Sequence, residues 1–218
     1  ADLCVVGLGG SGLAAVAAAL ECGLSVIGID AGEVAGGAAG RNGGFLLAGL
    51  ARFHHDVVRQ VGRALAARLY RETLLELDRL RAQTPEHVRI TGSLRIADSD
   101  EELDDCEAQQ LAMRADGFEA ERYEGPEGRG LLFPADGVCN PLARARALVQ
   151  QLLASGARLF EHTRAERFSE GAVHAAAGVI EARDVIVAID GCLEDVFEEL
   201  RGRVRTARPS RRSASQEG

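Results

Sequence analysis

Glycines and one acid near the N-terminus are the residues of this chain best suited to hold a ligand. Gly7, Gly9 and Gly12 form a GxGxxG segment that follows a short apolar run, and Asp30 ends the next apolar run. Glycines at this spacing allow a tight turn, close approach of a pyrophosphate to the backbone, and close packing of a helix on a strand. A carboxylate at the position of Asp30 can accept hydrogen bonds from a ribose. The pattern therefore predicts a site for a dinucleotide.

A strand, a helix and a second strand must position this turn. Residues 2–6 and 25–29 are short apolar runs typical of buried strands, and the alanine-rich residues between them have a helical composition. The start of such a helix offers free N–H groups and a positive dipole to phosphates. The alternative is a glycine-rich turn in an ordinary strand–helix–strand unit. The agreement of all parts of the motif favours the nucleotide site.

A second glycine-rich segment covers residues 32–44 and ends just before Phe45. It contains too much glycine for a helix or a strand. Because an apolar run follows at once, we expect an ordered loop whose backbone lies close to a ligand, and not a disordered segment. Arg41 and Asn42 can supply directed hydrogen bonds there.

The rest of the chain alternates between helical and strand patterns. Helical spacing of apolar residues predicts helices over residues 54–83 (as one long helix), 98–115, 141–155 and 192–200. Strand patterns occupy residues 88–90, 94–96, 158–161, a small antiparallel meander over 167–180, and the apolar run 184–189. We expect the last of these strands to be buried on both faces. The pattern predicts an α/β fold with a Rossmann-like parallel sheet.

Composition excludes several classes of protein. The chain has 218 residues, 46% of them hydrophobic, and a net charge of −8, so it can bury a core of one or two domains and lacks the charge of a general nucleic-acid binder. No run reaches the length of a membrane span. The five cysteines are scattered without CxxC spacing, which favours a reducing cytosol over a disulfide framework or a zinc site.

Two further features carry weaker expectations. His54 and His55 stand at the start of the predicted long helix without metal-ligand spacing, so we expect a solvated pair at a helix end, with a role near the bound ligand as the alternative. The arginine-rich residues 201–218 cannot form one face of a core, and we expect a solvated or foreign tail, with a nucleic-acid arm as the alternative. No residue is a convincing acid, base or nucleophile, so the catalytic residues stay unknown.

Taken together, these motifs resemble the D-amino-acid-oxidase-like family of FAD-dependent oxidoreductases, in particular its amine- and γ-glutamylputrescine-oxidase-like branch. Besides the GxGxxG segment and Asp30, residues 38–44 are similar to that branch's Ala-Ser-Gly-Arg-Asn-Gly-Gly segment, with Ala39 in place of the serine. Residues 137–163 and 185–191 extend the resemblance, which covers nearly all of residues 1–205.

The resemblance implies noncovalent FAD and oxidation of a C–N bond of a small-molecule amine or amino acid in the cytoplasm, with an imine and hydrogen peroxide as products. It implies that residues 32–44 wrap the pyrophosphate and approach the flavin ring. The FAD contacts that it implies are Gly7, Gly9, Gly10, Ser11, Gly12, Asp30, Ala31, Ala39, Arg41, Asn42, Gly43, Gly44, Ala165, Ala188 and Gly191. We expect neither a metal site nor a nucleic-acid partner.

The resemblance also implies a domain layout and a longer chain. Residues 1–53 and 137–200 would form the FAD-binding domain, residues 54–136 part of an α+β substrate domain, and residues 201–218 a basic tail. Such enzymes run well beyond this length, and the simplest explanation is a truncated or frame-shifted reading frame. One alternative is a catalytically inactive nucleotide-binding fragment. Another is an NAD-dependent enzyme, in which Asp30 would favour NAD over NADP by repelling a 2′-phosphate.

Overall fold

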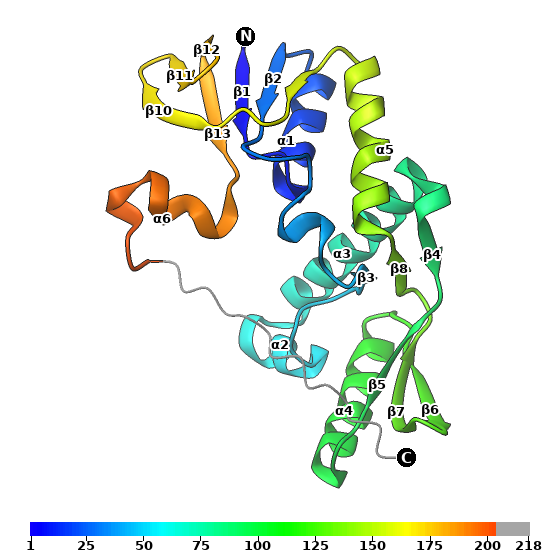
Figure 1. Cartoon of the computed structure of the whole chain (residues 1–218). Helices are drawn as coiled ribbons and strands as arrows, with labels where there is room; N and C mark the ends of the chain where they lie inside the picture. Colours follow the sequence, from blue (N-terminus) through cyan, green and yellow to red (C-terminus); the bar gives the residue numbers. More distant parts are fainter. Residues whose placement is uncertain (204–218) are drawn as a thin grey trace, which may run out of the picture. The chain divides into compact units, whose positions relative to one another are not determined.

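A computed structural model describes residues 1–203 and divides them into two compact units (Figure 1). The first unit joins Ala1–Glu33 to the chain from Gly156 onward, and the second is Val34–Ser155. The functional domain boundaries expected from the sequence stay a prediction. The greater part of the basic tail, residues 204–218, lies outside the described residues.

The first unit is built on a parallel sheet with the strand order β13-β1-β2-β9. Its strands are β1 (Leu3–Val6), β2 (Val26–Ile29), β9 (Arg158–Phe160) and β13 (Asp184–Val187). Every residue of β1 and β2 is buried, because helix α1 (Gly10–Glu21) contacts these strands and the antiparallel meander that follows β9 packs against their other side chains. In Figure 1 α1 lies beside β1 and β2. The predicted strand–helix–strand unit is confirmed.

A small antiparallel meander packs on the parallel sheet through a shared cluster of apolar side chains. It consists of β10 (Ala165–Ser169), β11 (Ala172–Ala175) and β12 (Gly178–Glu181). Val173 of the meander is fully buried against Cys4, Val6, Ile27 and Ile29 of the parallel sheet. The Rossmann-like α/β prediction, with a parallel sheet and a small meander, is therefore confirmed.

Two expectations for the end of the first unit are wrong. Strand β13 is the edge strand of the sheet, and Ile186 is 41% exposed, so this strand is not buried on both faces. The expected helix over 192–200 is a series of short turns in which α6 spans only Leu193–Val196, between 3-10 turns at Asp190–Cys192 and Glu198–Leu200. Hydrophobic content alone could not distinguish an edge strand from a central one.

The second unit combines helices with two three-stranded antiparallel sheets. One sheet has the order β3-β8-β4, with β3 at Phe45–Leu46, β8 at Gly137–Cys139 and β4 at Val88–Ile90. The other has the order β5-β7-β6, with β5 at Ser93–Ile96, β7 at Gly128–Phe133 and β6 at Glu121–Gly125. The helices are α2 (His54–Val61), α3 (Arg63–Gln83), α4 (Asp100–Ala115) and α5 (Pro141–Ala154).

Local sequence signals explain where these helices begin and end. The side chain of Ser99 accepts a hydrogen bond from the backbone of Glu102 at the start of α4, and Asn140 caps α5 in the same way. The long helix predicted over 54–83 is instead two helices, because Gly62 has φ +82° and ψ 153°. Residues with a Cβ avoid that conformation, so the glycine divides α2 from α3.

The second unit contains a buried cluster of aromatic and aliphatic side chains. Tyr70, Met113 and Phe118 are buried together, and Phe133 packs against them. Helix α4 lies beside strands β5, β7 and β6 in Figure 1 and contacts β7. None of the helices formed by residues 1–203 has both the length and the apolar character needed to cross a membrane.

Candidate functional site

The GxGxxG turn of the first unit is held by contacts that only glycine permits. Gly7 has φ +94°, and a Cβ there would lie 2.5 Å from the carbonyl oxygen of Ala188. A Cβ on Gly12 would overlap the carbonyl oxygen of Gly7, which is backbone and cannot move aside. The backbone of Gly7 also donates to the oxygen of Ile29 at 2.8 Å. The turn is therefore locked between β1, β2 and the end of β13.

The start of α1 offers open backbone beside this turn. Gly9 is the N-cap residue, and no side chain caps the helix. A Cβ on Gly10 would meet nothing within 4 Å, and Ser11 is exposed. The first N–H groups of a helix have no partner within the helix, so this end presents unpaired donors and a positive dipole to an open surface. These residues fit the pyrophosphate of a dinucleotide.

Asp30 holds the turn through its carboxylate. Its Oδ2 accepts from the backbone N–H of Leu8 at 2.7 Å, and its Oδ1 accepts from that of Gly32 at 2.9 Å. A carboxylate has about four acceptor sites, so two bonds leave capacity for a ribose hydroxyl. Asp30 thus fixes the shape of the turn. The ribose contact expected for Asp30 stays a prediction.

The other cofactor contacts expected in the first unit lie in several different elements. The N–H of Ala188 donates to the oxygen of Val6 at 2.7 Å, which brings Ala188 against the glycine turn. Ala31 follows Asp30 in a bend. Ala165 begins β10, and Gly191 lies in the 3-10 turn that precedes α6.

The predicted cofactor contacts of the second unit lie in a loop that the side chain of Asn42 holds together. Asn42 donates through Nδ2 to the carbonyl oxygens of Ala39 (2.8 Å) and Ala38 (3.2 Å), and its Oδ1 accepts from Gly44 at 2.8 Å. Gly44 has φ +70°, and its oxygen accepts from Cys139 at 2.7 Å. Asn42 therefore orders the loop, while the side chain of Arg41 and the backbone of Gly43 are exposed.

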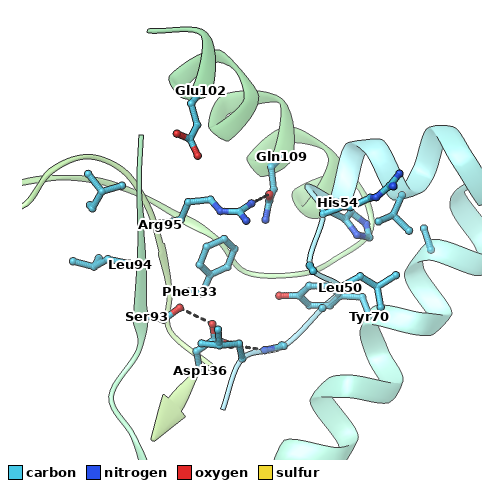
Figure 2. A pocket seen from close by; sticks show the side chains of 18 residues that line it. Leu50, His54, Tyr70, Ser93, Leu94, Arg95, Glu102, Gln109, Phe133 and Asp136 are labelled. Carbon is cyan, nitrogen blue, oxygen red and sulfur yellow. Dashed lines mark hydrogen bonds between the residues drawn. The ribbon is translucent and has the colours of Figure 1, made fainter. Parts of the chain in front are cut away.

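A pocket of about 410 Å³ lies within the second unit and was not expected from the sequence (Figure 2). Its walls come from the 47–52 loop, α2, α3, β5, α4, and the end of β7 with the turn that follows it. Its polar lining side chains are Arg52, His54, Tyr70, Ser93, Arg95, Glu102, Gln109 and Asp136. The pocket is therefore a side-chain site whose members are scattered over about ninety residues of sequence.

Asp136 organises one side of this pocket although it is only 4% exposed. Its Oδ1 accepts from the backbone of Ala48 at 2.8 Å, and its Oδ2 accepts from the hydroxyl of Ser93 at 2.6 Å. Burial, together with the Asp136 carboxylate, raises the pKa of Tyr70 to about 12. The phenol of Tyr70 therefore keeps its proton at neutral pH, and Figure 2 shows its hydroxyl pointing toward the side of the pocket that holds Ser93 and Asp136.

The histidines at the start of α2 are buried, which corrects the expectation of a solvated pair. His54 is 4% exposed and His55 is 7% exposed. The Nε2 of His54 lies 2.8 Å from Oδ2 of Asp116, and its ring meets Tyr70 and Phe118 edge to face. His54 and Val57 share one helix face at the spacing i, i+3, and this was the signal for burial in the sequence.

One serine–histidine pair resembles a nucleophile and its base but has the wrong proton arrangement. Ser169 Oγ lies 2.8 Å from Nε2 of His174, and the guanidinium of Arg167 lies 3.1 Å from Nδ1. Because a guanidinium only donates, Nδ1 must accept, and Nε2 carries the proton and donates to the serine. Such a histidine cannot take the serine proton. Among residues 1–203, no group of three or more His, Cys, Asp or Glu side chains could hold a metal ion.

The fold and the glycine turn are those of the Rossmann-type class of α/β proteins. The family model described as "DAO: FAD dependent oxidoreductase" matches residues 2–215, and the chain belongs to this family.

Curated and solved relatives are consistent with that membership. The γ-glutamylputrescine oxidoreductase of Escherichia coli (strain K12) is 26% identical over 219 residues, covering 90% of this chain and 50% of the relative. L-Proline dehydrogenase from P. horikoshii superposes with a TM-score of 0.71 at 18% identity, over 90% of this chain and 54% of that one. Glycine oxidase from Bacillus cereus ATCC 14579 gives 0.68 at 18% identity, over 91% and 58%. The chain thus spans about half the length of these proteins.

Proposed function

We propose that this chain binds FAD noncovalently and belongs to an enzyme that oxidises a C–N bond of a small-molecule amine or amino acid. When bound, FAD supplies the two-electron chemistry: the substrate loses two electrons and two protons to become an imine, and O₂ is reduced to hydrogen peroxide. The residues that would hold the ADP part are the glycine turn, the start of α1 and Asp30. Those that would approach the flavin are Arg41, Asn42, Gly43 and Gly44.

The observation that carries this proposal is the open, uncapped start of α1 next to a turn that tolerates only glycine. Family membership supports FAD over other dinucleotides. The printed names of the relatives, which include a γ-glutamylputrescine oxidoreductase and a glycine oxidase, support an amine or amino acid as substrate. A cytoplasmic location belongs to the same proposal and agrees with five cysteines that are all free thiols.

A cofactor-binding measurement tests the proposal directly. The purified chain, refolded with FAD, should show flavin absorbance bands, and FAD and ADP should raise its melting temperature while NAD does not. Gly10→Val should weaken FAD binding at least tenfold, because the new side chain fills the space where the pyrophosphate would lie without touching the protein. Ala18→Val, at an exposed position farther along α1, is the matched control and should bind normally.

Chemical readouts separate the remaining alternatives. Acid precipitation should leave the pellet colourless if FAD is noncovalent, and yellow pellets would contradict that part. Peroxide release from a panel of amines and amino acids would report C–N oxidation. Binding of ADP and FAD without turnover of any amine would favour a catalytically inactive nucleotide-binding chain, and stabilisation by NAD alone would overturn the flavin assignment.

A further inference from the structure

Two guanidinium groups at the pocket of the second unit are paired with neutral partners. Arg95 Nη1 donates to the amide oxygen of Gln109 at 3.0 Å, and Arg52 Nη1 donates to that of Gln60 at 3.3 Å. Within residues 1–203, neither arginine forms an ion pair with a carboxylate. Arg52 is exposed at the rim, whereas Arg95 is half-buried with its guanidinium 4.2 Å from the centre of the Phe53 ring.

The acids of the same pocket are already committed to other donors. Both oxygens of Asp136 accept hydrogen bonds, from Ala48 and Ser93. Glu102 accepts through Oε2 from the backbone of Asp98 at 3.1 Å. Figure 2 shows Arg95 and Gln109 side by side between Glu102 and the Ser93–Asp136 pair. Donor capacity is therefore left over at Arg52 and Arg95, since a guanidinium has five N–H donors, and Arg95 is the less exposed of the two.

A half-buried cation without an anionic partner costs free energy that a bound anion would recover. A guanidinium binds a carboxylate especially well because its planar fork matches the two oxygens. The lining of the same pocket also includes apolar side chains such as Leu47, Leu50 and Val57. Its volume of about 410 Å³ falls in the range of small-molecule sites.

We propose that this pocket binds the carboxylate of a small organic molecule through Arg95, with the apolar wall receiving the rest of that molecule. If the molecule is the substrate, Arg95 selects amines that carry a carboxylate over plain amines, and this role rests on the proposed oxidation function. Binding of the carboxylate itself does not depend on flavin or on turnover.

Calorimetric titration of the whole chain with N-acetylleucine and with its neutral amide, N-acetylleucinamide, tests the proposal. The two probes have nearly the same shape and lack a free amine, so neither can be oxidised at nitrogen. The acid should bind at least about tenfold more tightly than the amide, because only the acid can form charge-assisted hydrogen bonds with Arg95. Arg95→Gln should abolish this difference, and Arg95→Lys should retain part of it.

Arg129→Gln is the matched control, because Arg129 lies on β7 of the same sheet, is exposed and pairs with Asp100 outside the pocket lining. It should leave the preference for the acid unchanged. Equal binding of acid and amide to the unaltered protein, no binding of the acid, or a preference that survives Arg95→Gln in a folded variant would each overturn the proposal. A chain that binds the acid but takes up no flavin would retain the carboxylate site and refute the oxidation function.

Discussion

The glycine turn of the first unit and the polar pocket of the second use different chemistry. The turn is built from backbone: N–H groups, carbonyl oxygens and glycines whose missing Cβ leaves room for other main-chain atoms. The pocket is built from side chains that six separate segments bring together. Backbone sites depend on a few positions at fixed spacing, whereas side-chain sites depend on the packing of a whole unit. The two regions should therefore respond differently to substitution.

The largest effect is expected at the backbone site. Gly12→Ala should destabilise the flavin-free protein by roughly 3 kcal/mol or more, because the added methyl group overlaps the carbonyl oxygen of Gly7. Gly10→Ala introduces the same methyl group two residues earlier, where nothing lies within 4 Å. It should leave stability unchanged or raise it by up to about 1 kcal/mol.

Urea unfolding of both variants without cofactor provides the comparison. Similar urea midpoints for Gly12→Ala and Gly10→Ala would mean that the turn relaxes easily around an added methyl group. The backbone site would then be no more sensitive to substitution than the side-chain pocket. A large separation would show that the spacing of the glycines is itself a packing requirement, present before any ligand arrives.

An intermediate effect on the free energy of unfolding is expected at the buried pair of His54, which lines the pocket, and Asp116. Asp116→Asn should cost about 2 kcal/mol, because Asp116 accepts from His54 at 2.8 Å and its side chain is only 3% exposed. Arg122→Gln removes the exposed Arg122–Glu107 pair of the same unit and should change stability by no more than about 0.5 kcal/mol.

Unfolding free energies from urea titration check this ranking. Equal small losses would show that the His54–Asp116 pair adds nothing to the packing of α2 on α4. A loss confined to Asp116→Asn would sharpen the comparison, since it would show that one polar contact under the pocket matters more than exposed pairs around it.

The same contrast explains what the sequence could predict. The glycine turn, the parallel strands and the helices that Ser99 and Asn140 cap each have a local signature, and all of these elements were predicted. The pocket was missed because Arg95, Gln109 and Asp136 carry no spacing signal and meet only through tertiary packing. The edge position of β13 was also missed, because it depends on how strands pair and not on their hydrophobic content. The break at Gly62 was missed because the apolar spacing continues across it, and an isolated glycine within such a pattern does not always end a helix.

The smallest effect concerns the ionisation of the pocket phenol, and it tests whether the pocket excludes water as a packed side-chain site should. The pKa of Tyr70 is raised to about 12 by burial and by the Asp136 carboxylate, against 10.0 for an exposed tyrosine. Between these two values the unfolded chain loses the proton of Tyr70 while the folded chain keeps it. Stability from the buried phenol is therefore present below pH 10 and is lost as the pH rises toward 12, by roughly 1–2 kcal/mol.

Tyrosinate absorbance after a rapid pH jump can follow this ionisation, because the chain has only two tyrosines, Tyr70 and Tyr123. Tyr70→Phe should remove the step near pH 12, and Tyr123→Phe, at a tyrosine paired with Glu127, should leave that step in place. Loss of a step near pH 10 in Tyr70→Phe would mean that water reaches the phenol freely. The pocket would then be an open surface groove. Arg95 would not be shielded from water there, and the carboxylate proposal, which depends on this shielding, would fail as well.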